Sequence, residues 1–189
     1  MRTNNDSSDK DKHEKLKELI LYIANKLEKD PKFGATKLNK ILFFSDFIAY
    51  AKFGKSITGE RYFKLPYGPA PRQFKPVKDS MVLNGEIVCF TVDTLTGPQK
   101  RIAPNRPANI NIFKPEEIAI VDQVIYLLKD KDASEVSELS HFFMGWRIVK
   151  EGKDIPYYTV FIADPSKTVV TERHRKIAEK IAKENGTTG

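Results

Sequence analysis

The sequence predicts a mainly helical domain of the α+β class, compact and with a small antiparallel β-hairpin or sheet inserted. Apolar residues recur at helical spacing in several separate segments, and one stretch near the middle alternates as a hairpin does. The chain has 189 residues, 40% of them hydrophobic, which is enough for one sizeable core and short for two. We therefore expect five to seven helices around a single core.

The first elements follow from composition and spacing. Residues 1–11 are polar, charged and poor in large apolar side chains, which predicts a disordered tail. From about Lys12 the apolar spacing predicts an ordinary amphipathic helix that closes at Asp30-Pro31. Its expected inward face consists of Leu16, Leu19, Ile20, Ile23 and Leu27.

The second predicted helix, "KLNKILFFSDFIAYAKFG", is apolar almost all round its axis, which is typical of a central helix surrounded by others. Thr36 is the expected N-cap, and Gly54 stands where a left-handed C-terminal residue is favoured. Asn39 and Asp46 share one face, so both need hydrogen-bond partners if that face is buried. Arg61 or a tyrosine hydroxyl from the following stretch would supply one.

The stretch "GERYFKLPYGPAPRQF" combines aromatic, proline and glycine residues at high density. Residues 61–65 alternate as a short extended segment, with Tyr62 and Lys64 expected on one side and Phe63 and Leu65 toward the core. Gly68 and Pro69 predict a rigid turn after it. Pro69 or Pro71 is then expected to open a helix that ends near Asn84-Gly85.

A hairpin is predicted next, with strands Glu86–Val92 and Gln99–Ala103, as an insertion at about 86–104. Cys89 lies in its apolar run and is expected to be a small buried hydrophobe. As the single cysteine it excludes an internal disulfide and a cysteine-rich metal site.

The second half of the chain is predicted to be helical again. A helix starts at Pro115, and a capping-box pair, Asp132 and Glu135, starts another with Val136 and Leu139 inward. Gly145 is expected to interrupt or bend the segment "SHFFMGWRIVK", and "IPYYTVFIAD" is short and rich in β-forming residues. Residues 165–185 are expected to form a basic terminal helix that packs on or extends the domain.

The order of three motifs carries a family likeness. A buried helix ends in "FGKSITG", "YFKLPYGPAP" follows, and "ELSHFFMGW" comes later. Over roughly residues 12–164 the chain resembles the SocA-like, or Panacea, antitoxin domain of bacterial and phage toxin–antitoxin pairs. Tyr67-Gly68-Pro69 is the most specific part of the match, and the spacing from His141 to Trp146 also agrees. The residues between His141 and Trp146, which are often polar in the family, are here apolar.

The resemblance implies a non-enzymatic protein that binds a co-encoded toxin and keeps it inactive, with a link to phage defence. It also leaves open a role as an adaptor that delivers its toxin or another client to an intracellular protease, as one family member does. No catalytic motif is recognisable, since the three histidines and the carboxylates are scattered. We therefore expect no catalytic residues, no metal and no cofactor.

The candidate contacts with a protein partner come from the proline-rich stretch and the last motif. They are Tyr62, Lys64, Tyr67, Arg72, Gln73, His141 and Trp146. Rigid aromatic side chains lose little entropy on docking and concentrate in binding hot spots. The structural alternative is that Trp146 anchors the core and His141 bonds a backbone carbonyl, with Asn39, Asp46, Gly68 and Pro69 maintaining the fold.

The net charge of +7 permits attraction to nucleic acid or to an acidic protein without selecting either. Lys100, Arg101 and Arg106 form the clearest basic group, so a nucleic-acid-binding regulator is an alternative hypothesis. No stretch is apolar enough for a membrane span and no secretory signal is recognisable, so we expect a cytoplasmic protein. A homodimer and a hetero-oligomer with the toxin are both left open.

Overall fold

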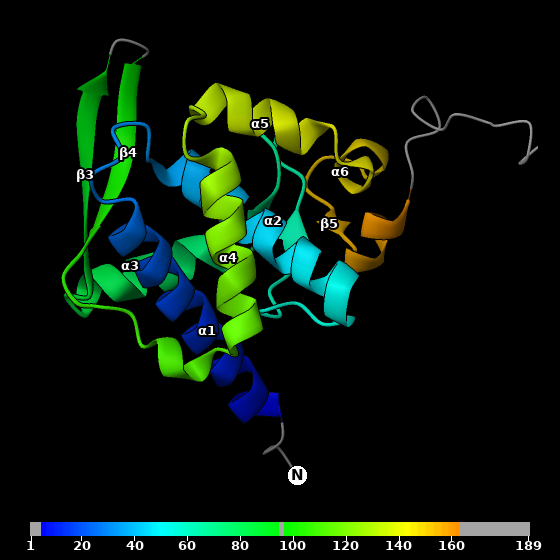
Figure 1. Ribbon diagram of the computed structural model, residues 1–189, viewed down its shortest axis with the longest axis horizontal. Coiled ribbons are helices and arrows are strands. Elements are labelled where there is room, and N and C mark those ends of the chain that lie inside the picture. Colours follow the sequence, from blue (N-terminus) through cyan, green and yellow to red (C-terminus); the bar gives the residue numbers. More distant parts are fainter. Residues whose placement is uncertain (1–4, 95–96, 163–189) are drawn as a thin grey trace, which may run out of the picture.

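The computed structural model describes residues 5–94 and 97–162, and within them it confirms a mainly helical fold with two small antiparallel sheets (Figure 1). The helices are α1 (Asn5–Lys26), α2 (Ala35–Phe53), α3 (Phe74–Leu83), α4 (Pro115–Leu128), α5 (Ala133–His141) and α6 (Met144–Ile148), with 3-10 turns η1 (Ile110–Ile112) and η2 (Tyr157–Phe161). Strands β1 (Tyr62–Phe63), β2 (Ala70–Pro71) and β5 (Asp154–Ile155) form one sheet, in the order β2-β1-β5. β3 (Ile87–Thr94) and β4 (Gly97–Pro104) form a hairpin. The terminal helix expected at 165–185 lies outside the described residues.

Helix α2 is the centre of the fold, as its apolar circumference predicts. α1, α4, α5, η2 and β2 all pack against it, and Figure 1 shows α4 crossing in front of it. Gly54 ends the helix with a left-handed φ of 68°. The expected cap at Thr36 is wrong, because the helix begins at Ala35, after Gly34, without a side-chain cap. Gly34 is pressed against the hairpin, where a Cβ atom would lie 2.8 Å from Cγ of Gln99.

Helix α1 is longer and more deeply buried than expected. It starts at Asn5, so most of the segment 1–11 that we expected to be a tail belongs to the helix. All five predicted inward residues are buried, and so are Glu18, Leu21 and Tyr22 on other sides of the helix. The reason is that α1 packs against α2, α3, β4 and η1 rather than against a single layer. An ordinary amphipathic helix was therefore too simple a prediction.

An aromatic cluster fills the core between α2, β1 and the end of the described chain. Phe43, Phe47, Tyr62, Phe143 and Tyr157 pack with ring centroids 4.4 to 6.3 Å apart. Tyr62 is only 1% exposed, so it does not lie on the surface as its predicted contact with a protein partner would require. The buried Asp46 needs a donor, and the Tyr62 hydroxyl lies 2.8 Å from its Oδ2 atom. The hydrogen bond to Asp46 favours the side of β1 that carries Tyr62 facing inward.

The prolines after β1 act differently from the expectation. Pro71 belongs to β2, which pairs with β1 through Tyr62 opposite Pro71 and Phe63 opposite Ala70. α3 begins only at Phe74 and ends before Gly85, whose φ is 68°. Neither Pro69 nor Pro71 therefore opens the helix.

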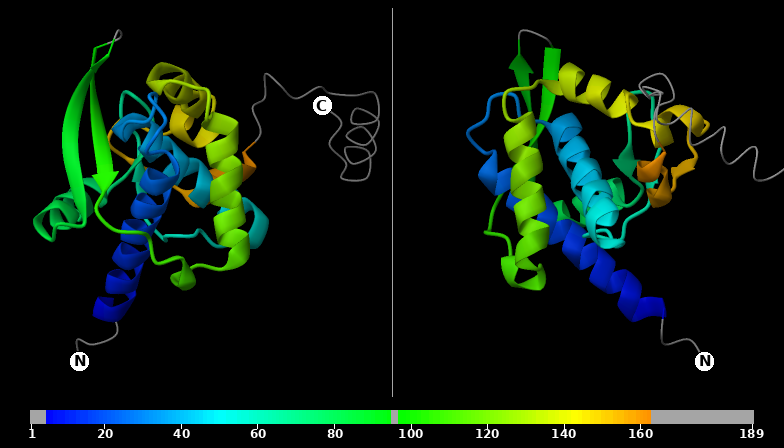
Figure 2. Two further views of the ribbon diagram at one scale, coloured as in Figure 1. Left: turned by 60° about the vertical axis from the view of Figure 1, so that its left-hand side comes forward. Right: turned by 45° about the vertical axis from the view of Figure 1, so that its right-hand side comes forward.

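The hairpin extends beyond the helical body (Figure 2, left). Its two strands match the predicted ones to within two residues. Ile87 and Ile102 at its base are buried, whereas Cys89 is exposed, so the prediction of a buried cysteine is wrong. The apolar run of β3 continues past the point at which the hairpin leaves the core.

The connection between α5 and α6 also differs from the prediction. The capping box of Asp132 and Glu135 is confirmed, but Leu139 is 39% exposed rather than inward. The chain breaks after His141 and not at Gly145, which lies buried inside α6. A Cβ atom on Gly145 would lie 2.2 Å from Oγ1 of Thr159, so the glycine permits η2 to pack closely on α6. The segment expected to be β-rich forms only β5 and the turn η2.

Candidate partner-binding surface

The turn at Gly68 is locked between α2 and α5. Gly68 has a φ of 96°, a conformation that favours glycine. A Cβ atom there would lie 2.2 Å from Oγ of Ser140 and 2.8 Å from Nζ of Lys40. The Lys40 ammonium donates to the carbonyl oxygen of Pro69 at 3.2 Å. The turn is therefore fixed by both backbone conformation and close packing.

Trp146 holds the same turn from the other side. Its indole Nε1 donates to the carbonyl oxygen of Leu65 at 3.2 Å, and His141 stacks on its ring with centroids 4.0 Å apart. The Lys64 ammonium lies 4.2 Å from the indole centroid and donates to the Val149 carbonyl at 3.1 Å. The two family motifs, distant in sequence, thus meet in one place.

Aromatic and apolar side chains are exposed around this contact. Tyr67 is 79% exposed at the tip of the turn, and Phe142 is 60% exposed beside His141. We call the group Lys64, Tyr67, His141, Phe142 and Trp146 the aromatic turn surface. The contacts at Gly68 and Trp146 hold its backbone in place, and the side chains of Tyr67 and Phe142 are exposed on it.

The titration of His141 follows from this setting. Burial lowers its pKa, and the nearby positive charge of Lys40 lowers it further, while a hydrogen bond with the Pro66 backbone acts in the opposite direction. Burial also lowers the pKa of Lys40 to about 8. Among the described residues no carboxylate lies within ion-pair distance of Lys40. Lys40, which donates to the Pro69 carbonyl beneath the turn, therefore has no anionic partner among the described residues.

A buried carboxylate fixes the segment that leads into the turn. Asp46 accepts hydrogen bonds from the Thr58 backbone N–H and the Tyr62 hydroxyl, each at 2.8 Å, and from the Thr58 hydroxyl. Burial raises the pKa of Asp46, against the effect of these donors. The expectation that a tyrosine hydroxyl serves Asp46 is therefore confirmed. Oδ1 of Asn39 is buried without a hydrogen-bond partner in the described part of the chain.

Arg72 and Gln73, the other predicted contact residues, are partly buried. Arg72 is engaged within the fold, with an ion pair to Asp154, a hydrogen bond to the Gly152 carbonyl at 2.7 Å and its guanidinium 4.6 Å from the Phe63 ring. Gln73 is half-buried at the start of α3. Phe142, which the sequence prediction did not include, is more exposed than either of them, and its apolar character between His141 and Trp146 was the available signal.

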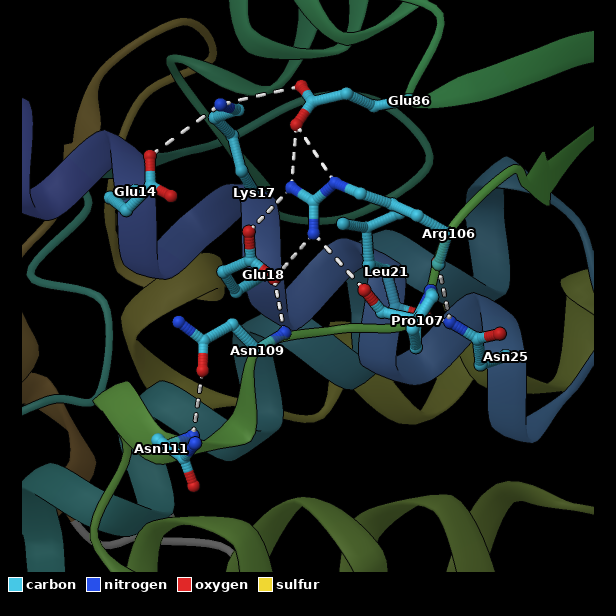
Figure 3. A network of polar contacts seen from close by, with 10 residues as sticks. All are labelled: Glu14, Lys17, Glu18, Leu21, Asn25, Glu86, Arg106, Pro107, Asn109 and Asn111. Carbon is cyan, nitrogen blue, oxygen red and sulfur yellow. Dashed lines mark hydrogen bonds and ion pairs between the residues drawn. The ribbon is translucent and has the colours of Figure 1, made fainter.

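The three basic residues proposed for nucleic acid do not form one patch. Figure 3 shows the Arg106 guanidinium between Glu18 and Glu86, with Nη2 2.6 Å from an oxygen of each. Arg101 donates to the backbone carbonyls of Glu28 and Asp30, and of the three residues only Lys100 is exposed. Arg106 and Arg101 are therefore structural, which is a correction to the basic-patch hypothesis.

The partner of Arg106 was not foreseen. Glu18 is 2% exposed on α1 and also accepts the backbone N–H of Asn109 at 2.6 Å. Burial alone would raise the pKa of Glu18, but Arg106 and the Asn109 N–H outweigh it and leave that pKa lowered. The network attaches the loop after β4 to α1.

Comparison with known proteins gives one result. A family model described as antitoxin SocA-like, Panacea domain, matches residues 38–147, which is more than half of the chain. No curated protein and no solved structure matches the chain. Across residues 5–94 and 97–162, no helix has the length and apolarity to cross a membrane. That same part of the chain holds no cluster of three or more side chains able to ligate a metal ion.

Proposed function

Because the chain belongs to the family of SocA-like antitoxins with a Panacea domain, we propose that it neutralises a cognate toxin by direct binding. The toxin would be held in a stoichiometric complex in the cytoplasm, with its active or target-binding surface covered. The proposal requires no chemistry on the toxin and no cofactor. It requires a protein surface that is exposed, rigid and rich in groups that bind well.

The aromatic turn surface is the observation that supports this proposal most directly. Tyr67 projects from a turn that Gly68, Lys40 and Trp146 hold in place. An exposed aromatic on a fixed backbone loses little conformational entropy on binding, and tyrosine and tryptophan are enriched in hot spots. We propose Tyr67 as the central anchor, with Phe142, Lys64 and the His141–Trp146 pair around it.

The size and charge of the interface follow from general rules. A tight inhibitory complex buries about 1,600 Å² in total, or roughly 20–30 residues on each side. The five residues of the aromatic turn surface would therefore form the centre of a larger contact. The net charge of +7 would accelerate capture of a toxin with an acidic surface, and added salt would slow that association.

The first test is co-expression with the product of the neighbouring gene. We expect that product to stop growth when expressed alone, and to be harmless and to co-purify when this chain is present. A neighbour that is harmless alone and forms no complex would contradict the antitoxin role for that pair. Rescue of growth without a complex would contradict direct binding.

The second test locates the interface with matched variants. Tyr67→Ala removes the proposed anchor, and Tyr126→Ala removes a tyrosine that is 67% exposed on α4. We expect Tyr67→Ala to raise the Kd for the toxin by about 30-fold, as loss of a hot spot of about 2 kcal/mol does, and Tyr126→Ala to change it less than about twofold. Both variants should keep the wild-type Tm. Equal effects of the two variants would rule out the aromatic turn surface.

The two alternatives differ in support. The nucleic-acid hypothesis is weakened, because Arg106 and Arg101 make contacts within the protein. The protease-adaptor hypothesis depends on the terminal segments 1–11 and 165–185, and the second of these lies outside the described residues. We therefore propose sequestration alone.

A further inference from the structure

The two strands of the hairpin present different outer edges. In an antiparallel pair, residues alternate between those whose backbone groups face the partner strand and those whose groups face away. The Asn105 N–H donates to the Glu86 carbonyl at 2.9 Å, so Glu86 faces inward. Counting from Glu86, the residues Ile87, Cys89, Thr91 and Asp93 direct their N–H and C=O groups away from β4.

The outer edge of β4 is protected. Its outward positions are the partners of those four residues, namely Pro98, Lys100, Ile102 and Pro104. The two prolines have no N–H to donate, and α1 and α2 pack against this strand. Proline, lysine and cover by helices are the usual means by which proteins block an edge strand.

Helix α3 packs against β3 at the base of the hairpin, but beyond that base the outer edge of β3 lacks these protections. The strand "IVCFTVDT" contains no proline, lysine or arginine and is rich in β-forming residues. Ile87 is buried at the base, but Cys89, Thr91 and Asp93 are all exposed. Within the described residues, no hydrogen bond reaches the outward backbone groups of these three. Such an edge is a template for pairing with another strand.

We propose that a second copy of this chain pairs with β3 in an antiparallel ladder, with Thr91 on the two-fold axis. The three exposed outward residues are symmetric about Thr91, so this register uses all of them and does not require the buried Ile87. Thr91 then faces Thr91 of the second copy, and Cys89 faces Asp93. The two hairpins form one four-stranded sheet.

Side chains and charges agree with this register. Phe90 faces Val92 of the second copy, and the symmetry creates the pair twice on one face of the sheet. Aromatic and β-branched residues are favourable cross-strand partners. Asp93, the one acidic residue of the ladder, lies opposite Cys89 of the second copy. Lys100 is on β4, so the two β3 strands lie between it and Lys100 of the second copy. No like charges face each other across the new pair.

The size of the contact predicts a weak dimer. The ladder from Val88 to Thr94 comprises seven residues per copy, and α3, which ends in the exposed Val82 and Leu83, packs against β3. This is well below the 20–30 residues per side of a standard stable interface. Each copy also carries a net charge of +7, so repulsion opposes association and added salt should strengthen the dimer. Salt should have the opposite effect on capture of an acidic toxin.

The first test measures mass against concentration for the full chain alone. Between about 1 and 500 μM, the range in which an interface below standard size dissociates, we expect the mass to rise from 21.6 kDa toward twice that value. Thr91→Pro removes the central N–H without touching the β3–β4 hydrogen bonds, as Pro98 and Pro104 do in β4, and should abolish the rise. Thr91→Val keeps the N–H and should retain it. A wild-type mass that stays at the monomer value throughout would overturn the proposal.

The second test fixes the register through the single native cysteine. In Asp93→Cys, each new thiol faces Cys89 of the second copy at a hydrogen-bonded position, where Cα atoms lie about 5.5 Å apart, within disulfide range. The matched control is Val92→Cys, whose thiol lies on the other face of the sheet. We expect mild oxidation to yield covalent dimer from Asp93→Cys and not from Val92→Cys. Equal cross-linking of the two variants would overturn the register.

The toxin is the competing occupant of this edge. A chain that stays monomeric, but whose toxin binding is lost in Thr91→Pro and kept in Thr91→Val, would overturn self-pairing and assign the edge to the toxin. The inference does not depend on the antitoxin proposal, because the mass and cross-linking measurements use this chain alone.

Discussion

Replacing Gly68 by alanine tests whether the turn is locked as the structure indicates. A residue with a Cβ atom at a φ of 96° carries backbone strain of about 1–2 kcal/mol. The new methyl group would also lie 2.2 Å from the Ser140 hydroxyl and 2.7 Å from Cε of Lys40. Forcing a group into such packed surroundings costs about 1–3 kcal/mol more. We expect Gly68→Ala to lower the free energy of unfolding by roughly 2–5 kcal/mol.

Gly152 provides the matched control. Its φ is 74°, but a Cβ atom there would meet nothing within 4 Å. Gly152→Ala should therefore cost only the backbone strain, about 1–2 kcal/mol. Urea denaturation of both variants, followed by circular dichroism, measures the difference. Thermal melts should show a Tm for Gly68→Ala that is roughly 4–20 °C below that of wild type, since about 2–4 °C corresponds to 1 kcal/mol at this size.

A double variant separates the steric part from the backbone part. Ser140→Ala removes the nearest atom at the cost of its hydrogen bond to the Ser137 carbonyl, about 1 kcal/mol. If the close contact is the cause, Gly68→Ala combined with Ser140→Ala should be less destabilising than the sum of the two single changes. The argument for a locked turn is refuted if Gly68→Ala costs no more than Gly152→Ala, or if the two changes simply add.

Three further results are expected. Arg106→Ala should destabilise the protein by about 3–5 kcal/mol in urea denaturation, because it leaves the buried Glu18 unpaired. Lys100→Ala, which removes an exposed side chain of β4, should stay within about 0.5 kcal/mol, and similar costs for both variants would contradict the network. Asp46→Ala should lower the free energy of unfolding more than Tyr62→Phe does. The alanine leaves both the Thr58 N–H and the Tyr62 hydroxyl without their acceptor, whereas the phenylalanine removes only one donor. A smaller loss of stability for Asp46→Ala would refute the central role of the carboxylate. Lys40 has a pKa of about 8 in the folded protein against 10.5 in the unfolded chain, so the unfolded chain binds more protons above pH 8 and stability from this group should rise with pH. The free energy of unfolding should be higher at pH 9.5 than at pH 7.5 in wild type and not in Lys40→Met. Both pH values lie below the pKa of tyrosine in the unfolded chain, about 10.

The central elements were predictable because their signals are local. An apolar helix with a glycine at its end identifies α2, a capping pair identifies α5, and alternation with turn residues identifies the hairpin. The need of Asp46 for a tyrosine hydroxyl was also predictable, since a buried carboxylate must find donors. The turn at Gly68 was predictable because glycine adopts a positive φ freely and the proline after it has a fixed φ.

Other features depend on tertiary contacts that a single segment does not encode. Tyr62 alternates with Phe63, and Tyr62 turns inward to the carboxylate of Asp46 and to the rings of Phe43 and Phe47. Cys89 lies in an apolar run that resembles a core strand, but the hairpin has left the body there. Arg106 and Glu18 are 88 positions apart, and the sequence around each of them gives no signal that they form a pair. Exposure of the predicted contacts could therefore not be assigned from sequence.

The central position of α2 also has a consequence for timing during synthesis. The carboxylate of Asp46 on α2 is approached by Tyr157 of η2, whose hydroxyl lies 3.5 Å away, so the core is complete only when the ribosome has passed η2. Asp46 and Tyr157 are 111 positions apart, so at about 5–20 residues per second the ribosome needs roughly 6–22 s to pass from one to the other. During this interval the core of the new chain is incomplete, so only molecules finished earlier could bind a toxin. A cell that uses this protein as an antitoxin needs a standing pool of finished molecules, or must translate it first.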